Sequence, residues 1–470
     1  MIPVDWYVRR QGKPLALDHQ GFLFSTIQPL IGGGPPGLWN TNAARWREFP
    51  AYLLQNLVSS MLAANHTTDG EQIDYDLHGL IGIRLINPSP LDAAAVARQL
   101  GPLRNRLSRE PDIIIRFVPQ LEISSPMRLI GLNDAGFADD AFFVLRSRHK
   151  AKAKVKVAFD QIGKQCEVVC ESGLPSIPLL IPIVNLTALS KGAIPLHASA
   201  FTYDGTGVVV TGWSKGGKTE TLLAFMANGA QYIGDEWVIL TADGLHMYGI
   251  PEPIRVWDWH LEHLPQFRRL IRYSDRFRLQ AIRLCQALYQ RIPNTSRTGF
   301  GPATILRRAM LQLQRQLYVD IAPHRLFGEG ACSLHGKPEK ILFAISHDSD
   351  EVIVSQTDPL EISRRMVHSL SYELTDFWAY YLMFRFAFPS RANDLIDNAA
   401  RYQSDILSKA LAGKDTYTVY HPYPVPLRQL YAAVRPFCSA QFSSEELVSS
   451  QIQAAEAESK TQEVSKGHWA

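Results

Sequence analysis

The sequence predicts an α/β protein. Taken over the whole chain, its class is α+β. Three observations lead to this fold class. The apolar run Gly207–Thr211, a glycine-bearing turn and the helical pattern Glu220–Ala227 form a strand–turn–helix unit. Residues 77–170 carry mostly strand signals, and residues 360–411 have the apolar spacing of helices.

The turn between the strand and the helix carries a phosphate-binding motif. Residues 212–219 read GWSKGGKT, which matches the pattern G-x-x-x-x-G-K-[ST]. Such a loop aims backbone N–H groups and the positive end of a helix at one point, where a polyphosphate can bind. The residues expected to hold a nucleotide are Gly212, Ser214, Lys215, Gly216, Gly217, Lys218 and Thr219. The alternative is a chance match in an ordinary strand–turn–helix.

Length and composition limit the class of protein. At 470 residues the chain is long for one hydrophobic core, so we expect two or three domains. Hydrophobic residues make up 46% and charged residues 20%, as in soluble globular proteins. The net charge of +3 favours no class of partner by itself. Five scattered cysteines favour a reducing compartment, so we expect a cytoplasmic protein. Cys166 and Cys170 lie close together without a further metal ligand and are expected to be buried thiols.

No segment predicts a membrane span or a signal peptide. The first residues lack a basic region followed by an apolar one. The most apolar stretch, Leu174–Leu189, is interrupted by prolines and is too short to cross a bilayer, so it predicts a buried core segment.

Residues 1–172 are expected to form an N-terminal α+β domain without recognisable catalytic residues. It includes a strand at Gly21–Ser25, a helix at Phe49–Ala64 and a helix at Pro90–Leu107. The expected strands are Leu80–Leu85, Ile113–Phe117, Ala141–Leu145 and Val155–Phe159, and the helix Pro90–Leu107 lies between the first two of them.

Residues 173–257 are expected to hold the first part of the nucleotide domain. Strands at Leu196–Phe201 and Gly207–Thr211 predict a hairpin around Asp204-Gly205. The apolar run Gln231–Leu240 predicts a strand that contains two acids, Asp235 and Glu236. A buried charge is costly unless it is paired, and a Mg²⁺–ATP complex would pair with it. The alternative is a strand edge that points both acids at water.

The rest of the chain divides into three predicted segments. Residues 258–322 form an arginine-rich helical insertion, expected as two helices broken near residues 293–302. Its basic face is either solvated or docks an anionic partner. Residues 323–438 return to strands and then helices and complete the nucleotide domain. Residues 439–470 have the composition of a flexible tail.

Several of these stretches, in this order, resemble the bacterial HPr serine kinase/phosphorylase family, whose nucleotide fold is related to that of phosphoenolpyruvate carboxykinases. Leu196-His197 resembles the family's Leu-His, and residues 212–220 resemble its G-x-S-G-x-G-K-S-E. Residues 229–236 resemble the following G-x-x-L-x-x-D-D, and residues 326–331 resemble L-F-G-x-G-A.

This resemblance implies a kinase that uses ATP and Mg²⁺. Lys218 would meet the β- and γ-phosphates, and Glu220 would join the nucleotide site. Thr219, Asp235 and Glu236 would form the metal site. Asp235 or Glu236, which the sequence does not separate, would orient or deprotonate the acceptor hydroxyl. His197 would neighbour the reaction, and Arg255 is a further candidate for stabilising transition-state charge.

The expected acceptor is a serine of a protein or peptide, encoded nearby. One alternative is a carboxykinase-like kinase that acts on a small molecule. Another is an ATP-gated binding protein that holds an acidic partner or nucleic acid on its basic helices. Nucleic acid is not favoured, an oligomer is compatible with the sequence, and no membrane partner is expected.

Overall fold

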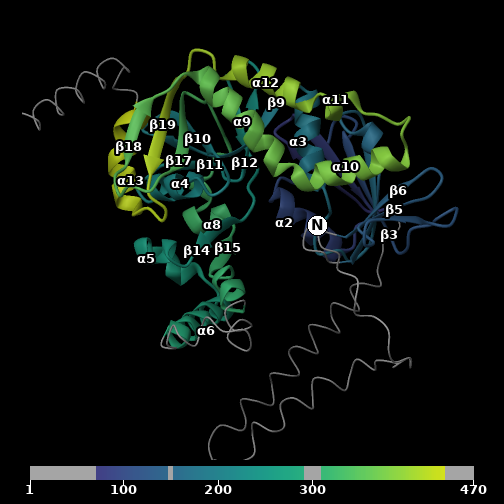
Figure 1. Ribbon diagram of the computed structural model, residues 1–470, viewed down its shortest axis with the longest axis horizontal. Helices are drawn as coiled ribbons and strands as arrows, with labels where there is room; N and C mark the ends of the chain where they lie inside the picture. Colours follow the sequence, from purple (N-terminus) through teal and green to yellow (C-terminus); the bar gives the residue numbers. More distant parts are fainter. Residues whose placement is uncertain (1–69, 147–151, 291–308, 440–470) are drawn as a thin grey trace, which may run out of the picture. The chain divides into compact units, whose positions relative to one another are not determined.

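The computed structural model describes residues 70–146, 152–290 and 309–439. It is a mixed α/β protein with two mixed sheets, a two-stranded ribbon and helices (Figure 1). The mixed α/β class predicted from the sequence is confirmed. The strand predicted at Gly21–Ser25, the helix predicted at Phe49–Ala64 and the predicted tail from 440 onward lie outside the described residues.

The first sheet has eight strands in the order β1-β2-β3-β8-β7-β6-β5-β4. Parallel pairs join β2, β3 and β8, and the remaining pairs are antiparallel. Its strands are β1 (Gln72–Leu77), β2 (Ile81–Ile86), β3 (Ile113–Val118), β4 (Arg128–Ile130), β5 (Ala135–Phe137), β6 (Phe142–Arg146), β7 (Lys152–Val157) and β8 (Cys166–Glu171).

The second sheet has nine strands and carries the phosphate-binding motif. Its order is β16-β13-β12-β9-β10-β17-β19-β18, with β11 paired to β9. The predicted hairpin is confirmed as the antiparallel pair β9–β10, while β10 pairs with β17 in parallel. Its strands are β9 (Ala193–Tyr203), β10 (Thr206–Gly212), β11 (Gln231–Gly234), β12 (Trp237–Thr241), β13 (Met247–Gly249), β16 (His335–Gly336), β17 (Lys340–Ser346), β18 (Ile353–Gln356) and β19 (Asp415–His421).

Helices cover both faces of the second sheet. The α-helices are α2 (Pro90–Leu100), α3 (Leu180–Ser190), α4 (Lys218–Met226), α5 (His260–His263), α6 (Tyr273–Gln290), α8 (Pro323–Phe327), α9 (Pro359–Glu373), α10 (Thr375–Ala387), α11 (Asp394–Asp397), α12 (Ala399–Ala410) and α13 (Leu427–Val434). Short 3₁₀ turns are η2 (Phe159–Gln161), η3 (Pro265–Leu270), η5 (Glu329–Ala331) and η6 (Arg435–Cys438). The predicted buried core segment around 174–189 is confirmed as α3, whose side chains are mostly buried.

The two faces of β10 point into different apolar clusters because side chains alternate along a strand. Val209 joins a cluster that includes α3, α9 and α10, whereas Val208 and Val210 join one that includes α4 and α13. The first cluster also contains residues of the eight-stranded sheet, such as Ile115. β8 ends at Glu171, near the domain boundary predicted at residue 172. The first cluster nevertheless contains buried apolar residues from both sides of that boundary. The predicted domain division itself stays a prediction.

The arginine-rich segment forms an arm on a two-stranded ribbon. The ribbon pairs β14 (Ile254–Trp257) with β15 (Tyr318–Ile321) in antiparallel register. Between these strands the chain forms α5, η3 and α6, and residues 309–314 are also helical (Figure 1). The predicted break near 293–302 lies outside the described residues. The expectation of two helices is wrong for the first part of the segment, where the short helix α5 and the 3₁₀ turn η3 precede α6.

Two predicted elements have different bounds in the structure. The helix expected at Pro90–Leu107 ends at Leu100, because Gly101 and Pro102 interrupt it. The single strand expected at Gln231–Leu240 is wrong. It is two strands, β11 and β12, with Asp235 and Glu236 at the break between them. The backbone turns there, with a positive φ of 67° at Glu236.

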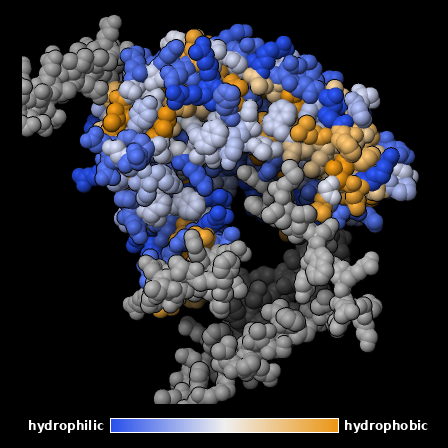
Figure 2. Space-filling view, viewed as in Figure 1, coloured by the Kyte–Doolittle hydropathy of each residue, from blue (hydrophilic) through white to orange (hydrophobic). Residues whose placement is uncertain are grey.

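Cys166 and Cys170 are free and buried, as predicted, and burial raises the pKa of the Cys166 thiol to about 12. The face in Figure 2 shows mainly hydrophilic residues, with hydrophobic ones gathered over the region of β5 and β6. Within the described ranges, no helix is long and apolar enough to cross a membrane.

Candidate nucleotide-binding and catalytic site

The phosphate-binding motif forms a tight loop between β10 and α4. The N–H of Gly216 donates to Trp213 O at 3.0 Å and closes the turn. Gly217 precedes the first turn of α4 as its N-cap and has a φ of 97°. Residues that carry a Cβ rarely adopt this backbone conformation. The space beside it is occupied by His421 from β19, whose Nε2 lies 2.8 Å from Gly216 O. The loop is therefore held from below by a strand remote in sequence.

Replacing Gly217 by alanine is expected to weaken ATP binding strongly. A Cβ at this position would lie 2.1 Å from His421 Nε2, so either the loop or the imidazole must move. Gly229→Ala is the matched control, because Gly229 also has a positive φ, of 90°, but no atom lies within 4 Å of its Cβ position. Calorimetric titration with Mg²⁺–ATP measures both variants. Equal affinities would show that the contact with His421 does not maintain the loop.

Lys218 provides a buried cation at the start of α4. Its side chain is mostly buried, and Nζ donates to Trp213 O at 2.8 Å. Burial lowers the pKa of Lys218, although Glu236, Glu373 and Asp235 counteract that effect by stabilising the charged form. A positive charge thus lies within the loop, next to a group of carboxylates.

The acidic side chains beside the loop fall into two halves, and Thr219 with Asp235 forms the first. Thr219 Oγ1 lies 3.2 and 3.1 Å from the two carboxylate oxygens of Asp235. Asp235 is only 2% exposed. Burial and the charge of Glu236 raise the pKa of Asp235 to about 8, against the hydrogen bond from Thr219 and the positive charge of Lys218. The reading of both acids as solvent-facing is wrong for Asp235.

His197 and two glutamates form the other half. His197 Nε2 lies 3.1 Å from Glu236 Oε2, and His197 Nδ1 lies 2.8 Å from Glu373 Oε1. Burial alone would lower the pKa of His197, but these two carboxylates raise it overall. The imidazolium can therefore hold both glutamates at once. Glu236 keeps 44% of its side chain exposed, so it faces accessible space whereas Asp235 does not.

The structure thus separates two acids that the sequence left equivalent. Asp235 is directed to the Thr219 hydroxyl, and Glu236 is directed to His197. Burial would raise the pKa of Glu236, but His197, Lys218 and Arg255 together lower it. Glu236 is consequently the carboxylate that stays charged, and Asp235 is the one that burial disfavours as an anion.

Buried polar atoms without partners lie beside Asp235. Glu252 Oε1 and the Tyr232 hydroxyl are buried and make no hydrogen bond. Burial, and then the charges of Glu236 and Asp235, raise the pKa of Glu252 well above its usual value. The segment that carries Glu252 is fixed by the Ile250 N–H, which donates to Trp237 O at 3.2 Å. Glu252 is thus a buried acid without a hydrogen-bond partner, within the influence of the charges of Asp235 and Glu236.

The donor set fits Mg²⁺ only together with a phosphate ligand. A hydroxyl and a carboxylate are oxygen donors of the kind that Mg²⁺ prefers, and it is commonly held by one or two carboxylates plus substrate phosphates. Among the residues that the structure describes, no three His, Cys, Asp or Glu side chains are grouped to hold a metal by themselves. A phosphate bound at the loop, beside Thr219 and Asp235, would supply the remaining oxygens.

Three residues at the site were missed by sequence reasoning: Glu373, His421 and His260. Glu373 ends α9 and His421 ends β19, so no local pattern connects either residue to the loop. His260 is fully buried in the arm and accepts the Trp257 N–H through Nδ1 at 3.1 Å. Its Nε2 therefore carries the proton and donates to Glu220 Oε1 at 3.1 Å.

The other predicted residues are less central. The Glu220 carboxylate is engaged with His260, so it links α4 to the arm, and its role toward a nucleotide stays a prediction. Ser214 is partly exposed and Lys215 is exposed on the loop. Arg255 lies over the Tyr318 ring at 4.1 Å and donates to Asp320 at 3.1 Å. Its assignment to transition-state charge also stays a prediction.

Asp235→Asn is expected to stabilise the ligand-free protein, more at pH 9 than at pH 6. The folded-state pKa of Asp235 is raised to about 8 from an ordinary 3.8, so its ionisation favours the unfolded chain increasingly as pH rises through that window. The gain at pH 9 should be at least about 1 kcal/mol. Urea unfolding at both pH values measures it, with the exposed-site variant Asp348→Asn as control. A stability difference independent of pH would contradict the assignment.

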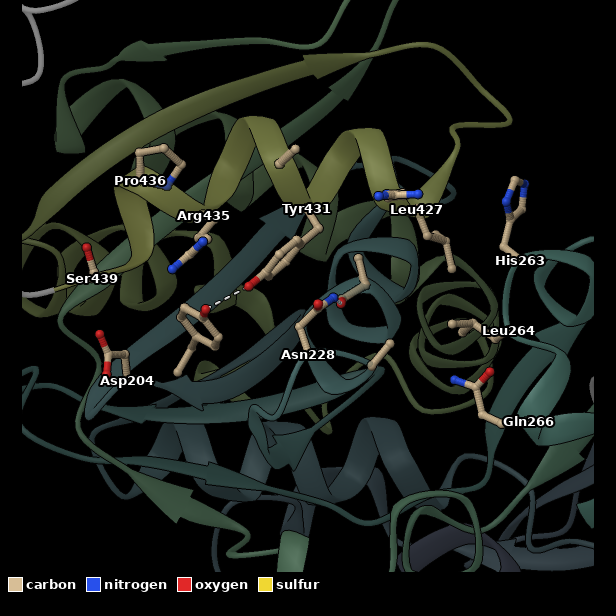
Figure 3. Close-up of a pocket in the computed structure, with 15 residues that line it drawn as sticks. Asp204, Asn228, His263, Leu264, Gln266, Leu427, Tyr431, Arg435, Pro436 and Ser439 are labelled. Carbon is tan, nitrogen blue, oxygen red and sulfur yellow. Dashed lines mark hydrogen bonds between the residues drawn. The ribbon is translucent and has the colours of Figure 1, made fainter.

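A cavity of about 840 Å³ lies at the other end of α4, away from the loop (Figure 3). The Tyr203 and Tyr431 hydroxyls meet in it at 2.7 Å. Residues around it include Asp204, Asn228, Arg428 and Arg435. None of the predicted site residues lines this cavity. We therefore place the candidate chemistry at the loop, where the titratable groups converge, and not in this cavity.

No protein-family model and no curated protein matches the chain. Among solved structures, the fold of this chain is similar to the structure of the Hpr(Ser) kinase/phosphatase from Coxiella burnetii, with 13% sequence identity and a TM-score of 0.21. The match covers 52% of this chain and 95% of that chain. This is a distant structural similarity, and at this TM-score it supports no statement about activity.

Proposed function

We propose that the protein is a kinase that transfers the γ-phosphate of ATP to a hydroxyl, with a serine of a protein or peptide as acceptor. The observation that carries this proposal is the convergence at one loop of Lys218, the Thr219–Asp235 pair and the Glu236–His197–Glu373 array. A binding protein would need the loop and the lysine. It would not need a second, histidine-held carboxylate that remains accessible beside them.

The residues would divide the work as follows. The N–H groups of the loop and Lys218 bind phosphate oxygens, and Thr219 with Asp235 holds Mg²⁺. When bound, Mg²⁺–ATP supplies the phosphoryl group and neutralises charge on it. Glu236 accepts the acceptor's hydroxyl proton on its carboxylate. His197 donates to Glu236 from Nε2 and is itself anchored by Glu373, so that Glu236 keeps its orientation.

Two features support Glu236 as the acceptor-side group. Its carboxylate is accessible, and its lowered pKa leaves it unprotonated at neutral pH. Asp235 has neither property in the ligand-free protein. Binding of a divalent cation would favour the ionised form of Asp235, which matches a role on the metal side.

The proposal is tested by following labelled γ-phosphate. The full-length protein is incubated with Mg²⁺ and γ-labelled ATP, together with purified products of neighbouring genes, peptides from them and small hydroxyl compounds. We expect label on a serine of a protein or peptide, identified by mass spectrometry. Label found only on a small molecule would favour the small-molecule kinase. ATP binding without label on any of these acceptors would leave an ATP-gated binding protein as the better description.

A further inference from the structure

Helix α6 of the arm presents an exposed apolar stripe. Four large side chains stand on one side of it: Tyr273 is 87% exposed, Phe277 74%, Leu284 61% and Leu288 54%. At 100° per residue these positions fall within about 60° of one another around the helix. We call them the α6 stripe. Exposed apolar residues are common singly, but four aligned on one helix face indicate a contact surface.

The stripe stands on a well-supported helix. The opposite side of α6 buries Leu279 and Ile282. Arg278 donates to Gln316 O at 3.0 Å and to Tyr318 O at 2.7 Å, which ties α6 to the strand β15. Arg283 forms ion pairs with Asp258 and Glu262. These contacts account for several of the arginines that sequence analysis left open between a solvated face and a docking surface.

The charge around the stripe is positive. The carboxylates of the described part of the arm all lie within 4 Å of an arginine, namely Asp258, Glu262, Asp275 and Asp320. Arg269 and Arg272 are exposed just before α6, and the side chain of Arg272 is 73% exposed. An occupant of the stripe would therefore be apolar at its centre and acidic at its edge. A second copy of the same basic surface would be repelled.

The arm is connected to the catalytic groups at its base. His260 in α5 donates to Glu220 in the first turn of α4, directly after the phosphate loop. Arg255 in β14 is close enough to Glu236 to lower the pKa of that carboxylate. The base of the arm, from which α6 extends, is thus joined to the residues of the site.

We propose that the α6 stripe docks an amphipathic, acidic segment of the protein or peptide acceptor, outside the residues that are phosphorylated. This inference rests on the proposed kinase function. Docking at a separate surface raises the local concentration of the acceptor hydroxyl at the site. It would let a site with an open, half-exposed Glu236 select its acceptor by a segment that the catalytic groups never touch.

The binding test uses the full-length protein and a designed probe. The probe is a fluorescein-labelled helical peptide of about 20 residues with a leucine stripe flanked by glutamates. A second peptide has lysines in place of the glutamates, and a third has serines in place of the leucines. Fluorescence anisotropy should show binding of the acidic apolar peptide, and at least about tenfold weaker binding of the other two.

Two variants then locate the binding. Phe277→Ser combined with Leu284→Ser should weaken the binding of the acidic apolar peptide at least about tenfold. The matched control is Leu382→Ser combined with Phe386→Ser, which removes two exposed apolar side chains of α10 that are 67% and 75% exposed. Arg269→Glu combined with Arg272→Glu should weaken the peptide and flatten the salt dependence of its binding. Circular dichroism checks that all variants are folded.

The outcomes separate the docking surface from the chemistry. Equal peptide affinity in the stripe and control variants would overturn the proposal. So would tighter binding of a single-stranded oligonucleotide than of the peptide, or a change from dimer to monomer on sedimentation of the stripe variant. ATP hydrolysis without acceptor is measured in parallel and should not change in the stripe variant. If the protein bound the peptide but transferred phosphate to no acceptor, the kinase proposal would be refuted. The docking surface would still be supported by the binding result.

Discussion

Replacing Asp235 by asparagine should lower the rate of phosphoryl transfer by about two orders of magnitude or more. Asparagine keeps the shape of the side chain and can still accept from Thr219, but it loses the negative charge that would hold Mg²⁺ beside that hydroxyl. ATP affinity should fall much less, because the loop N–H groups and Lys218 remain. Single-turnover transfer of labelled γ-phosphate measures the first effect, and calorimetry measures the second.

The companion variant Glu236→Gln distinguishes the two acids. It should also reduce transfer strongly, but without a change in the concentration of Mg²⁺ needed for half-maximal activity. Asp235→Asn should raise that concentration. Asp350→Asn, at an exposed position on the loop before β18, is the control for a change of one surface charge. If both site variants transferred phosphate at the rate of the unchanged protein, the acids would have no catalytic role.

Replacing Lys218 should have the second large effect, a loss of both ATP affinity and phosphoryl transfer. A charged hydrogen bond to phosphate contributes roughly 1.5–3 kcal/mol, so Lys218→Ala should weaken ATP binding by about ten- to a hundredfold. Transfer should fall further, since charge accumulates on the phosphoryl group during the reaction. Lys218 also lies among Asp235, Glu236 and Glu373, so its loss leaves their negative charges less compensated.

Lys218→Met keeps the apolar stem and tests whether charge or packing is responsible. Both variants should lose ATP affinity to a similar extent, because the stem is not the group that meets phosphate. Lys337→Ala, an exposed lysine that is 63% accessible, is the matched control. Thermal unfolding without nucleotide shows whether either variant is destabilised. Wild-type ATP affinity in folded Lys218→Ala would remove the loop from the proposed function.

Local patterns in the sequence were enough to predict the framework of the site. The apolar run before Gly212, the glycines of the loop and the helical spacing after it are consecutive in the chain. Each depends on backbone geometry and on the alternation or periodicity of side chains, which neighbouring residues determine. The hairpin β9–β10 follows for the same reason, and it places His197 on a strand next to the loop.

The break between β11 and β12 could not be predicted in this way. The run Gln231–Leu240 is apolar enough for one strand, apart from its two acids. At the break the Trp237 N–H donates to Asp235 O at 2.9 Å, and β13 approaches so closely that a Cβ on Gly234 would lie 2.9 Å from Gly249 Cα. The resulting turn sends Asp235 toward Thr219 and Glu236 toward His197. A pattern of hydrophobicity contains no information about such an approach.

The sequence by itself therefore determined the glycine-bearing loop at 212–219, its flanking strand and helix, and the types of side chain available for the proposed chemistry. The tertiary structure alone decided which of them meet. It brought Glu373 from the end of α9 to His197, His421 from the end of β19 under Gly216, and His260 from the arm to Glu220. The physical reason is that these contacts depend on how sheets and helices pack across long stretches of chain, whereas sequence patterns report only on the local backbone and on burial.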